Sequence, residues 1–339
     1  MSASINPETT NAVRSSIPFF TVRKKSAADS PEKMFGDERG SLHAGFCNIR
    51  WRPFRVLRTI DRNLPVYVPQ GRGSIQGLEV IPGEQFWLRL KQQLAGRKPM
   101  LFVHGYNVSF RKNMLRGRNF QSYTKMQERL VLFNWPSAGR TVEYTRDESN
   151  MEWSVHYLQQ VILGLLQHFG PGGFDLAAHS LGSRGLHLAI QGLGRSRDGK
   201  GVLSDNLILL AADIDADYFR QNLEVIRPTC NRLTVYVSDS DRALALSQEI
   251  HGYPRLGEAG EHLRDMPGVD FIDASRLPVQ RVSGHLYHID NGWISADLRL
   301  LLHDQLAPQD RKLLTRSNAM GRSSYWYIDE AGGGCVANG

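Results

Sequence analysis

A serine at position 180 stands where a nucleophile could be activated. Residues 178–182, Ala-His-Ser-Leu-Gly, follow the short, largely apolar run 174–177 and lead into a stretch of helical character. A strand that turns sharply into a helix strains the backbone at the corner and requires small flanking residues, here Ala178 and Gly182. The strain presents the serine hydroxyl at the sheet edge. The spacing predicts a nucleophile elbow, although so loose a motif arises by chance in roughly one chain in three of this length.

Further residues capable of acid–base chemistry follow other predicted strands. They are His104 and Gly105 after residues 100–103, Asp239 and Asp241 after residues 233–237, and His285 in the loop past the last strand. In an open parallel sheet, ligands bind at the carboxyl ends of the strands. A serine, an acid and a histidine at successive strand ends are therefore a more specific signal than the motif around Ser180.

The elements that must position these residues alternate in type along the chain. Predicted strands and helices occupy residues 65–68, 84–94, 99–103, 130–134, 149–168, 174–178, 183–193, 207–212, 217–225, 233–237, 242–250, 269–272 and 294–303. Strands that alternate with helices at short loops favour an α/β fold, with a mostly parallel sheet covered by helices on both faces. The unbroken apolar run at residues 207–210 is typical of a strand buried on both sides.

The domain organisation is expected to be simple. Residues 1–45 are rich in Ser, Asn, Pro, Lys and Asp and predict a partly mobile leader, followed by one domain over residues 46–316. Residues 317–339 predict a C-terminal tail in which Tyr325, Trp326 and Tyr327 anchor a loose, glycine-rich end.

Composition excludes several classes of protein. With 41% hydrophobic residues in 339, the chain can bury a large core. Its three cysteines are far apart, which indicates neither a disulfide framework nor a zinc site. No apolar run is long enough for a signal peptide or a membrane span, so we expect a soluble, cytoplasmic protein. The net charge of +7 is dispersed along the sequence without interleaved aromatic residues, and no nucleic-acid partner is expected.

A calcium-loop spacing is present but incomplete. Asp213, Asp215, Asp217 and Glu224 occupy positions 1, 3, 5 and 12, yet Tyr218 stands where such a loop needs glycine. We therefore expect no metal, and we expect these aspartates to cap the following helix and to shape the rim of the site.

Six segments together resemble a known family. They are residues 101–107, 133–139, 178–182, 211–217, 236–246 and 284–287. They look like a bacterial α/β-hydrolase family of largely unassigned function, often described only as esterase or lipase superfamily enzymes, and the resemblance runs from about residue 17 to near residue 303. It implies an α/β-hydrolase fold and a serine hydrolase site without a cofactor, but no particular substrate. One departure is Ala178, where many α/β-hydrolases have glycine.

The resemblance and the chain order suggest a role for each residue. Ser180 is the expected nucleophile, His285 the general base and Asp241 the acid that orients the imidazole. The backbone amides of Tyr106 and Leu181 are the expected oxyanion hole.

Alternatives remain for two of these roles. His288 is the rival base, three residues after His285. Asp239 and Asp213 are the rival acids, and Asp239 could instead cap the helix that begins at residue 242. His104 is expected to be structural, holding a loop that Gly105 lets approach the substrate.

The predicted activity is hydrolysis of carboxylic esters or thioesters through an acyl-enzyme, on a small-molecule or lipid-like substrate. An acyltransferase would use the same residues, and a non-catalytic binding module on this scaffold is the other alternative. The chain between residues 212 and 233 holds only about one helix, so no large lid domain is expected there. A fairly open site is expected.

Overall fold

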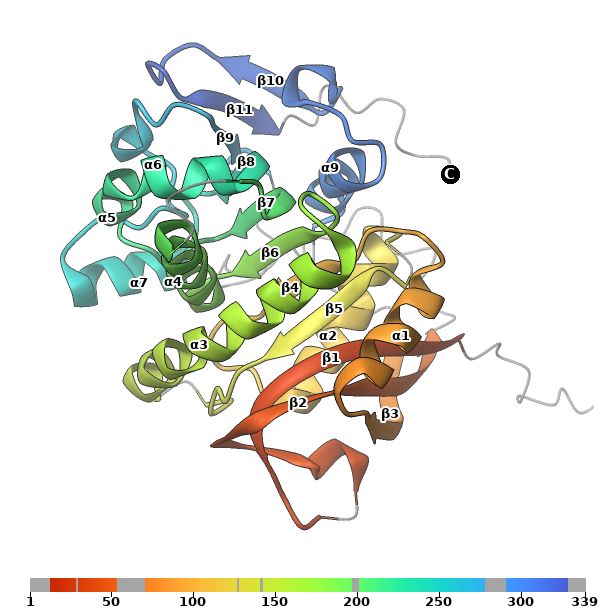
Figure 1. Cartoon of the computed structure of the whole chain (residues 1–339). Helices are drawn as coiled ribbons and strands as arrows, with labels where there is room; N and C mark the ends of the chain where they lie inside the picture. Colours follow the sequence, from red (N-terminus) through yellow and green to blue (C-terminus); the bar gives the residue numbers. More distant parts are fainter. Residues whose placement is uncertain are drawn as a thin grey trace, which may run out of the picture.

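The computed structural model describes residues 13–28, 30–53, 71–126, 128–140, 143–196, 201–277 and 291–328. They form an 11-stranded sheet in the order β10-β11-β9-β8-β7-β6-β4-β5-β1-β2-β3. Helices lie on both faces of this sheet (Figure 1). Pairing is parallel from β11 through to β1 and antiparallel at the two edges, which confirms the predicted mostly parallel sheet.

Six parallel strands form the centre of the sheet. They are β4 (Met100–Val103), β5 (Leu130–Asn134), β6 (Asp175–His179), β7 (Ser204–Leu210), β8 (Cys230–Val237) and β9 (Val269–Asp273). Nearly all their side chains are buried, because helices cover both faces. All six match predicted strands to within a few residues, and the predicted strand at residues 65–68 lies outside the described residues.

The sheet separates the core into two layers, and helices cover both of them. The helices are α1 (Gly83–Leu94), α2 (Phe110–Tyr123), α3 (Tyr144–Phe169), α4 (Leu181–Ser196), α5 (Ala216–Gln221), α6 (Leu223–Ile226), α7 (Arg242–His251) and α9 (Gly292–Leu302). On one face of the sheet, α1, α3 and α4 contribute apolar side chains to one core cluster. On the other face, α2 and α9 contribute to a second cluster.

The predicted leader is wrong for the residues that the structure describes. Strands β1 (Val13–Lys25), β2 (Phe35–Pro53) and β3 (Gly71–Val80) extend the sheet, and β1 pairs in parallel with β5. Phe19 and Phe20 are buried in opposite core layers, so β1 is an interior strand despite its polar composition. The predicted boundary between residues 45 and 46 falls inside β2.

The C-terminal boundary also falls inside an element. Strand β10 (Leu314–Ser317) contains the predicted break between residues 316 and 317, and β11 (Ser324–Ile328) pairs in parallel with β9. Tyr325 and Trp326 are buried in opposite core layers, and the Tyr325 hydroxyl donates to Asp273 at 2.7 Å. These aromatic residues belong to the sheet rather than to a tail that rests on it.

The connection from β7 to β8 contains α5, α6 and a short 3-10 helix, Arg227–Thr229, so no large lid domain is inserted there. Where the sequence predicted a single helix at residues 217–225, the structure has two short helices, α5 and α6. Among the described residues, no helix is both long and apolar enough to cross a membrane.

Candidate active site

Ser180 occupies the corner between β6 and α4. Its φ of 54° lies in the left-handed region, which residues with a Cβ seldom adopt. Its N–H donates to the carbonyl of Leu210 at 3.0 Å, and its own carbonyl accepts from the N–H of Ser183 at 2.9 Å. The sharp strand-to-helix corner expected from the spacing is therefore present and is fixed from both sides.

The small residues at the corner are required by close packing. A Cβ on Gly182 would lie 2.3 Å from the carbonyl oxygen of His104, and a Cβ on Gly105 would lie 2.8 Å from the Cβ of Ser180. Ala178 is fully buried in β6, between β4 and β7. The loop that follows β4 thus packs directly against the corner that carries Ser180.

His104 holds that loop in place. Its ring stacks on Trp135, with centroids 5.0 Å apart, and the indole N–H of Trp135 donates to the His104 carbonyl at 2.8 Å. Its Nδ1 lies 2.8 Å from the Gly105 carbonyl and must donate to it. Burial, together with the nearby Arg23 guanidinium, lowers the pKa of His104 well below its usual value. A neutral, stacked imidazole suits a structural role.

Asp147 fixes the far end of the same loop. At the start of α3, its carboxylate accepts from the N–H of Asn107 at 3.1 Å, from the N–H of Ala138 at 2.7 Å and from the Ser137 hydroxyl. Burial raises the pKa of Asp147, although these hydrogen bonds act to lower it. Asp147 was not predicted as part of the site, because the helix was expected to begin only at residue 149. An aspartate in the first turn of a helix was the available signal.

Asp213 follows β7 and is buried in a polar cluster on the rim of the corner. Its Oδ1 accepts from Arg255 at 2.8 Å and from Ser247 at 2.7 Å, and its Oδ2 accepts from the Tyr144 hydroxyl. Burial opposes the charge on Asp213, yet these partners, Arg255 foremost, lower its pKa. Its N–H donates to the Ser180 carbonyl at 3.3 Å. Asp213 is therefore a charged group committed to structural contacts.

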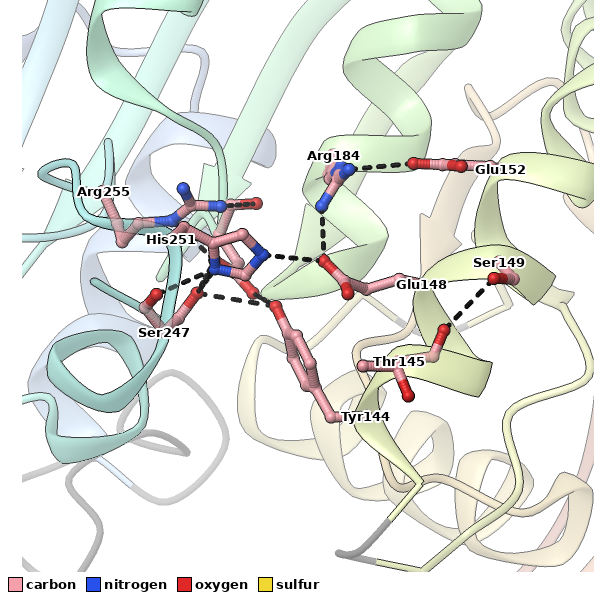
Figure 2. Close-up of polar contacts among 10 residues, drawn as sticks. Tyr144, Thr145, Glu148, Ser149, Glu152, Arg184, Ser247, His251 and Arg255 are labelled. Atoms are coloured by element: carbon pink, nitrogen blue, oxygen red, sulfur yellow. Dashed lines mark hydrogen bonds and ion pairs between the residues drawn. The ribbon is translucent and has the colours of Figure 1, made fainter. Parts of the chain in front are cut away.

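The cluster continues across three helices (Figure 2). Nε2 of His251 on α7 lies 3.0 Å from Glu148 on α3, and Glu148 accepts from Arg184 on α4 at 2.7 Å. The Tyr144 ring meets the ring of Tyr106 edge-on, with centroids 5.3 Å apart. The network thus connects α3, α4 and α7 to the loop after β4. Its members come from distant segments, and no short-range sequence signal links them.

The two candidate acids after β8 have different environments. Asp241 is 2% exposed and caps α7, where its Oδ1 accepts from the N–H groups of Ala243 at 3.1 Å and Leu244 at 3.2 Å. Asp239 lies on an exposed turn, and its N–H donates to Ser275 at 2.9 Å. The helix cap suggested for Asp239 is therefore made by Asp241. Strand β8 is two strands from β6 in the sheet.

The candidate bases, His285 and His288, lie outside the described residues. The two candidate oxyanion donors are described. Leu181 directly follows the serine as the first residue of α4, and Tyr106 follows Gly105 in the loop after β4.

The expectation of an open site is wrong at the nucleophile, because Ser180 is only 3% exposed. In the part of the chain that the structure describes, the cover comes from neighbouring segments of the hydrolase domain. Gly105 contacts the corner from one side, and the fully buried Leu181 follows it on the other.

The remaining aspartates of the calcium-loop spacing have local partners. Asp215 caps α5, accepting from the N–H groups of Asp217 and Tyr218 at 2.9 Å each, and Asp217 pairs with Arg220. In the described ranges, no three histidine, cysteine, aspartate or glutamate side chains gather as metal ligands.

A small hollow lies beside the loop after β4, on the side of the sheet that α2 covers. Phe102, Val108 and Phe120 contribute apolar lining, and Gly105 and His179 border it next to Ser180.

Comparison with known proteins identifies the family. Residues 84–300, more than half of the chain, match the family described as "alpha/beta hydrolase of unknown function". No curated protein matches the chain in sequence.

Similar solved structures share little sequence. A "predicted CIB-like hydrolase" from Thermoplasma acidophilum is 13% identical, with 76% of this chain and 92% of that chain covered and a TM-score of 0.35. The carboxylesterase EstE1, cloned from a metagenomic library, is 8% identical, with 77% and 85% covered and a TM-score of 0.32. The RedJ thioesterase from Streptomyces coelicolor is 15% identical, with 62% and 85% covered and a TM-score of 0.31. At these values, none of the three bears on activity.

The family match and the sheet order with its helices on both faces agree, and the chain belongs to this α/β-hydrolase family.

Proposed function

We propose that the protein hydrolyses carboxylic esters, thioesters included, through an acyl-enzyme on Ser180. The observation that carries the proposal is the strained serine, with φ of 54°, packed against the Gly105 loop at the carboxyl edge of the sheet. Strain at such a position is retained where the function needs it.

In the proposed reaction, Ser180 Oγ attacks the carbonyl carbon while His285 takes the hydroxyl proton. The ester C–O bond then breaks, and His285 returns the proton to the leaving alcohol. Water, deprotonated by His285, then attacks the acyl carbon. The bond from that carbon to Ser180 Oγ breaks, His285 returns the proton to Ser180 Oγ, and the carboxylic acid is released. Asp241 orients the imidazole and stabilises its cation.

The start of α4 supports an oxyanion hole. The first N–H groups of a helix have no acceptor within the helix, and they lie at the positive end of its dipole. Leu181 is the first of 16 helical residues, so its N–H is suited to the oxyanion. The second donor is the N–H of Tyr106. His104 and Asp147 fix the loop on either side of Tyr106, which suits a donor that must be in place before the reaction.

The choice of Asp241 over Asp213 follows from their partners. Both oxygens of Asp213 already accept hydrogen bonds, one of them from the Arg255 guanidinium. The Arg255 guanidinium already neutralises the Asp213 carboxylate, which leaves less negative charge to stabilise an imidazolium. Asp241 is buried and held by two backbone N–H groups.

A fluorophosphonate probe tests the proposal, because an activated serine displaces its fluoride and is phosphonylated much faster than an ordinary serine. We expect mapping by mass spectrometry to identify Ser180, and Ser180→Ala to abolish both labelling and ester hydrolysis. Ser183→Ala is the matched control, since Ser183 is a buried serine one turn further along the chain. Its hydroxyl has no hydrogen-bond partner among the residues that the structure describes. Unchanged hydrolysis by the Ser180→Ala protein would end the proposal.

A further inference from the structure

Four arginines gather on one face of the sheet extension formed by β1, β2 and β3. Arg14 on β1 lies directly opposite Arg50 on β2, and Arg52 on β2 lies directly opposite Arg72 on β3. Directly opposed residues of antiparallel strands project from the same face, as do Arg50 and Arg52, two residues apart on one strand. All four side chains therefore share one surface, here called the arginine face.

The arginine face is the solvent side of this part of the sheet. On the opposite side, Ile49, Trp51 and Ile75 are buried, and the Arg118 guanidinium of α2 lies 4.6 Å from the Trp51 ring centre. On the arginine face, Arg14, Arg52 and Arg72 are exposed and Arg50 is partly exposed.

Among the described residues, no acidic side chain balances the positive charge on this face. Like charges directly opposite each other on paired strands are destabilising, and two such pairs occur side by side. The strand ends, residues 13–18, 48–53 and 71–77, contain no aspartate or glutamate. Within the described ranges, no ion pair involves any of the four, whereas Arg89 near the other end of β3 pairs with Glu79. A bound polyanion would offset this repulsion.

The arginine face lies away from the candidate active site. Strand β1 runs parallel to β5, so its first residues lie at the amino edge of the sheet. Ser180 follows the last residue of β6 and lies at the carboxyl edge. A partner bound at the arginine face would leave the serine edge accessible.

We propose that the arginine face docks on an anionic lipid surface. The aromatic residue of these strand ends is Trp51, which is buried on the other side, so the face offers no platform for stacked bases. Ser16, Asn48 and Ser74 on the same face are short and polar, so nothing there would insert into the hydrocarbon. Exposed cations spread over a sheet face suit a layer of lipid phosphates, to which each arginine contributes additively.

Vesicle sedimentation of the full chain tests this inference at low salt. The vesicles are phosphatidylcholine alone, or phosphatidylcholine and phosphatidylglycerol in roughly equal parts. We expect binding to the anionic vesicles only. Arg50→Gln with Arg72→Gln should weaken it about 5-fold per arginine, about 30-fold for the pair, and the variant with lysine at both positions should retain most of it.

Arg264→Gln with Arg322→Gln is the control, because it removes the same charge from two exposed arginines that already pair with acids. Equal binding to both vesicle types, or an equal loss in the control, would overturn the inference. Binding to duplex DNA that depends on Arg50 and Arg72 and excludes vesicles would also overturn it, in favour of a nucleic-acid partner. Neither readout depends on hydrolysis, so the proposed esterase activity can fail or hold separately.

Discussion

The backbone conformation of Ser180 is strained, because the left-handed conformation of a residue with a Cβ costs on the order of 1–2 kcal/mol of conformational free energy. The hydrogen bonds from its N–H to Leu210 and from Ser183 and Asp213 to its carbonyl hold that conformation. They also fix the direction of the Cα–Cβ bond, so the hydroxyl has few alternative positions. The same contacts that impose the strain therefore orient the proposed nucleophile.

The proposed acid has a second task, and one substitution separates the two. Asn caps helices as well as Asp does, so Asp241→Asn should leave α7 and the stability of the protein nearly unchanged. Loss of the negative charge should lower kcat by roughly 10³- to 10⁴-fold, because the imidazolium is no longer stabilised. Steady-state hydrolysis of an activated ester, together with urea unfolding, measures both effects.

Asp239→Asn is the matched comparison two residues away, on an exposed turn. It should hydrolyse the ester at close to the wild-type rate. The opposite pattern, with activity lost in Asp239→Asn and kept in Asp241→Asn, would transfer the role to Asp239.

The corner at Ser180 could be predicted from sequence because its cause is local: one serine between two small residues at a strand end. The supporting residues could not. Asp147 lies 40 residues from Asn107, and Tyr144 lies 69 residues from Asp213, so each contact exists only once the strands are ordered in the sheet. The open site was wrongly predicted for the same reason, since the cover on Ser180 comes from the loop after β4.

At the scale of elements, the loop after β4 and the corner after β6 must approach as closely as their backbones allow. A Cβ on Gly105 would lie 2.8 Å from both the Ser180 Cβ and the His179 Nδ1. Gly105→Ala should therefore displace the loop and with it the amide of Tyr106. We expect the free energy of unfolding to fall by about 1–3 kcal/mol. The rate of fluorophosphonate labelling should also fall, by more than this loss of stability accounts for, because the Tyr106 amide is displaced.

Gly77→Ala on β3 is the control, because the nearest atom to its new Cβ is an Asn48 side-chain nitrogen at an ordinary 3.8 Å. Its labelling rate should match the wild type. If Gly105→Ala labels as fast as Gly77→Ala, the loop does not supply an oxyanion donor.

The strands that could be predicted are largely apolar runs, as is typical of parallel strands buried on both faces. Strand β1 was not predicted from the sequence, because it contains Pro18 and a proline argues against a central strand. The pairing explains why a proline is tolerated here. Strand β1 pairs with β5 only from Phe19 onward, so no N–H is needed at Pro18 to bond to β5. Strand β2 was not predicted either, because its arginines and glycines interrupt the apolar pattern, although positions such as Phe46 and Ile49 are buried.

At the scale of the whole molecule, charges that are dispersed in sequence become local in space. Arg14 and Arg72 are 58 residues apart, yet antiparallel pairing through β2 brings both to one face. The dispersion of the basic residues along the chain therefore gave no measure of their dispersion on the surface. Only the strand register shows the arginine face.

Stability should also depend on pH through a buried histidine on α4. His187 is 2% exposed and packs against the rings of Tyr218 and Phe219. Among the described residues, neither of its ring nitrogens has a hydrogen-bond partner. Burial lowers its pKa to about 4 from the usual 6.5. Between these values the unfolded chain binds a proton that the folded protein does not, so stability is full above pH 6.5 and falls with pH toward 4.

This histidine should account for about 2 kcal/mol of the stability lost between pH 7 and pH 5. His187→Phe keeps an aromatic ring against Tyr218 and Phe219 but cannot take up the proton. Urea unfolding of both proteins at the two pH values should give a correspondingly smaller loss for the variant. His104, whose pKa is also lowered by burial, is present in both proteins, so its contribution cancels in the difference. Equal losses in the two proteins would mean that His187 reaches water or a partner when it is protonated.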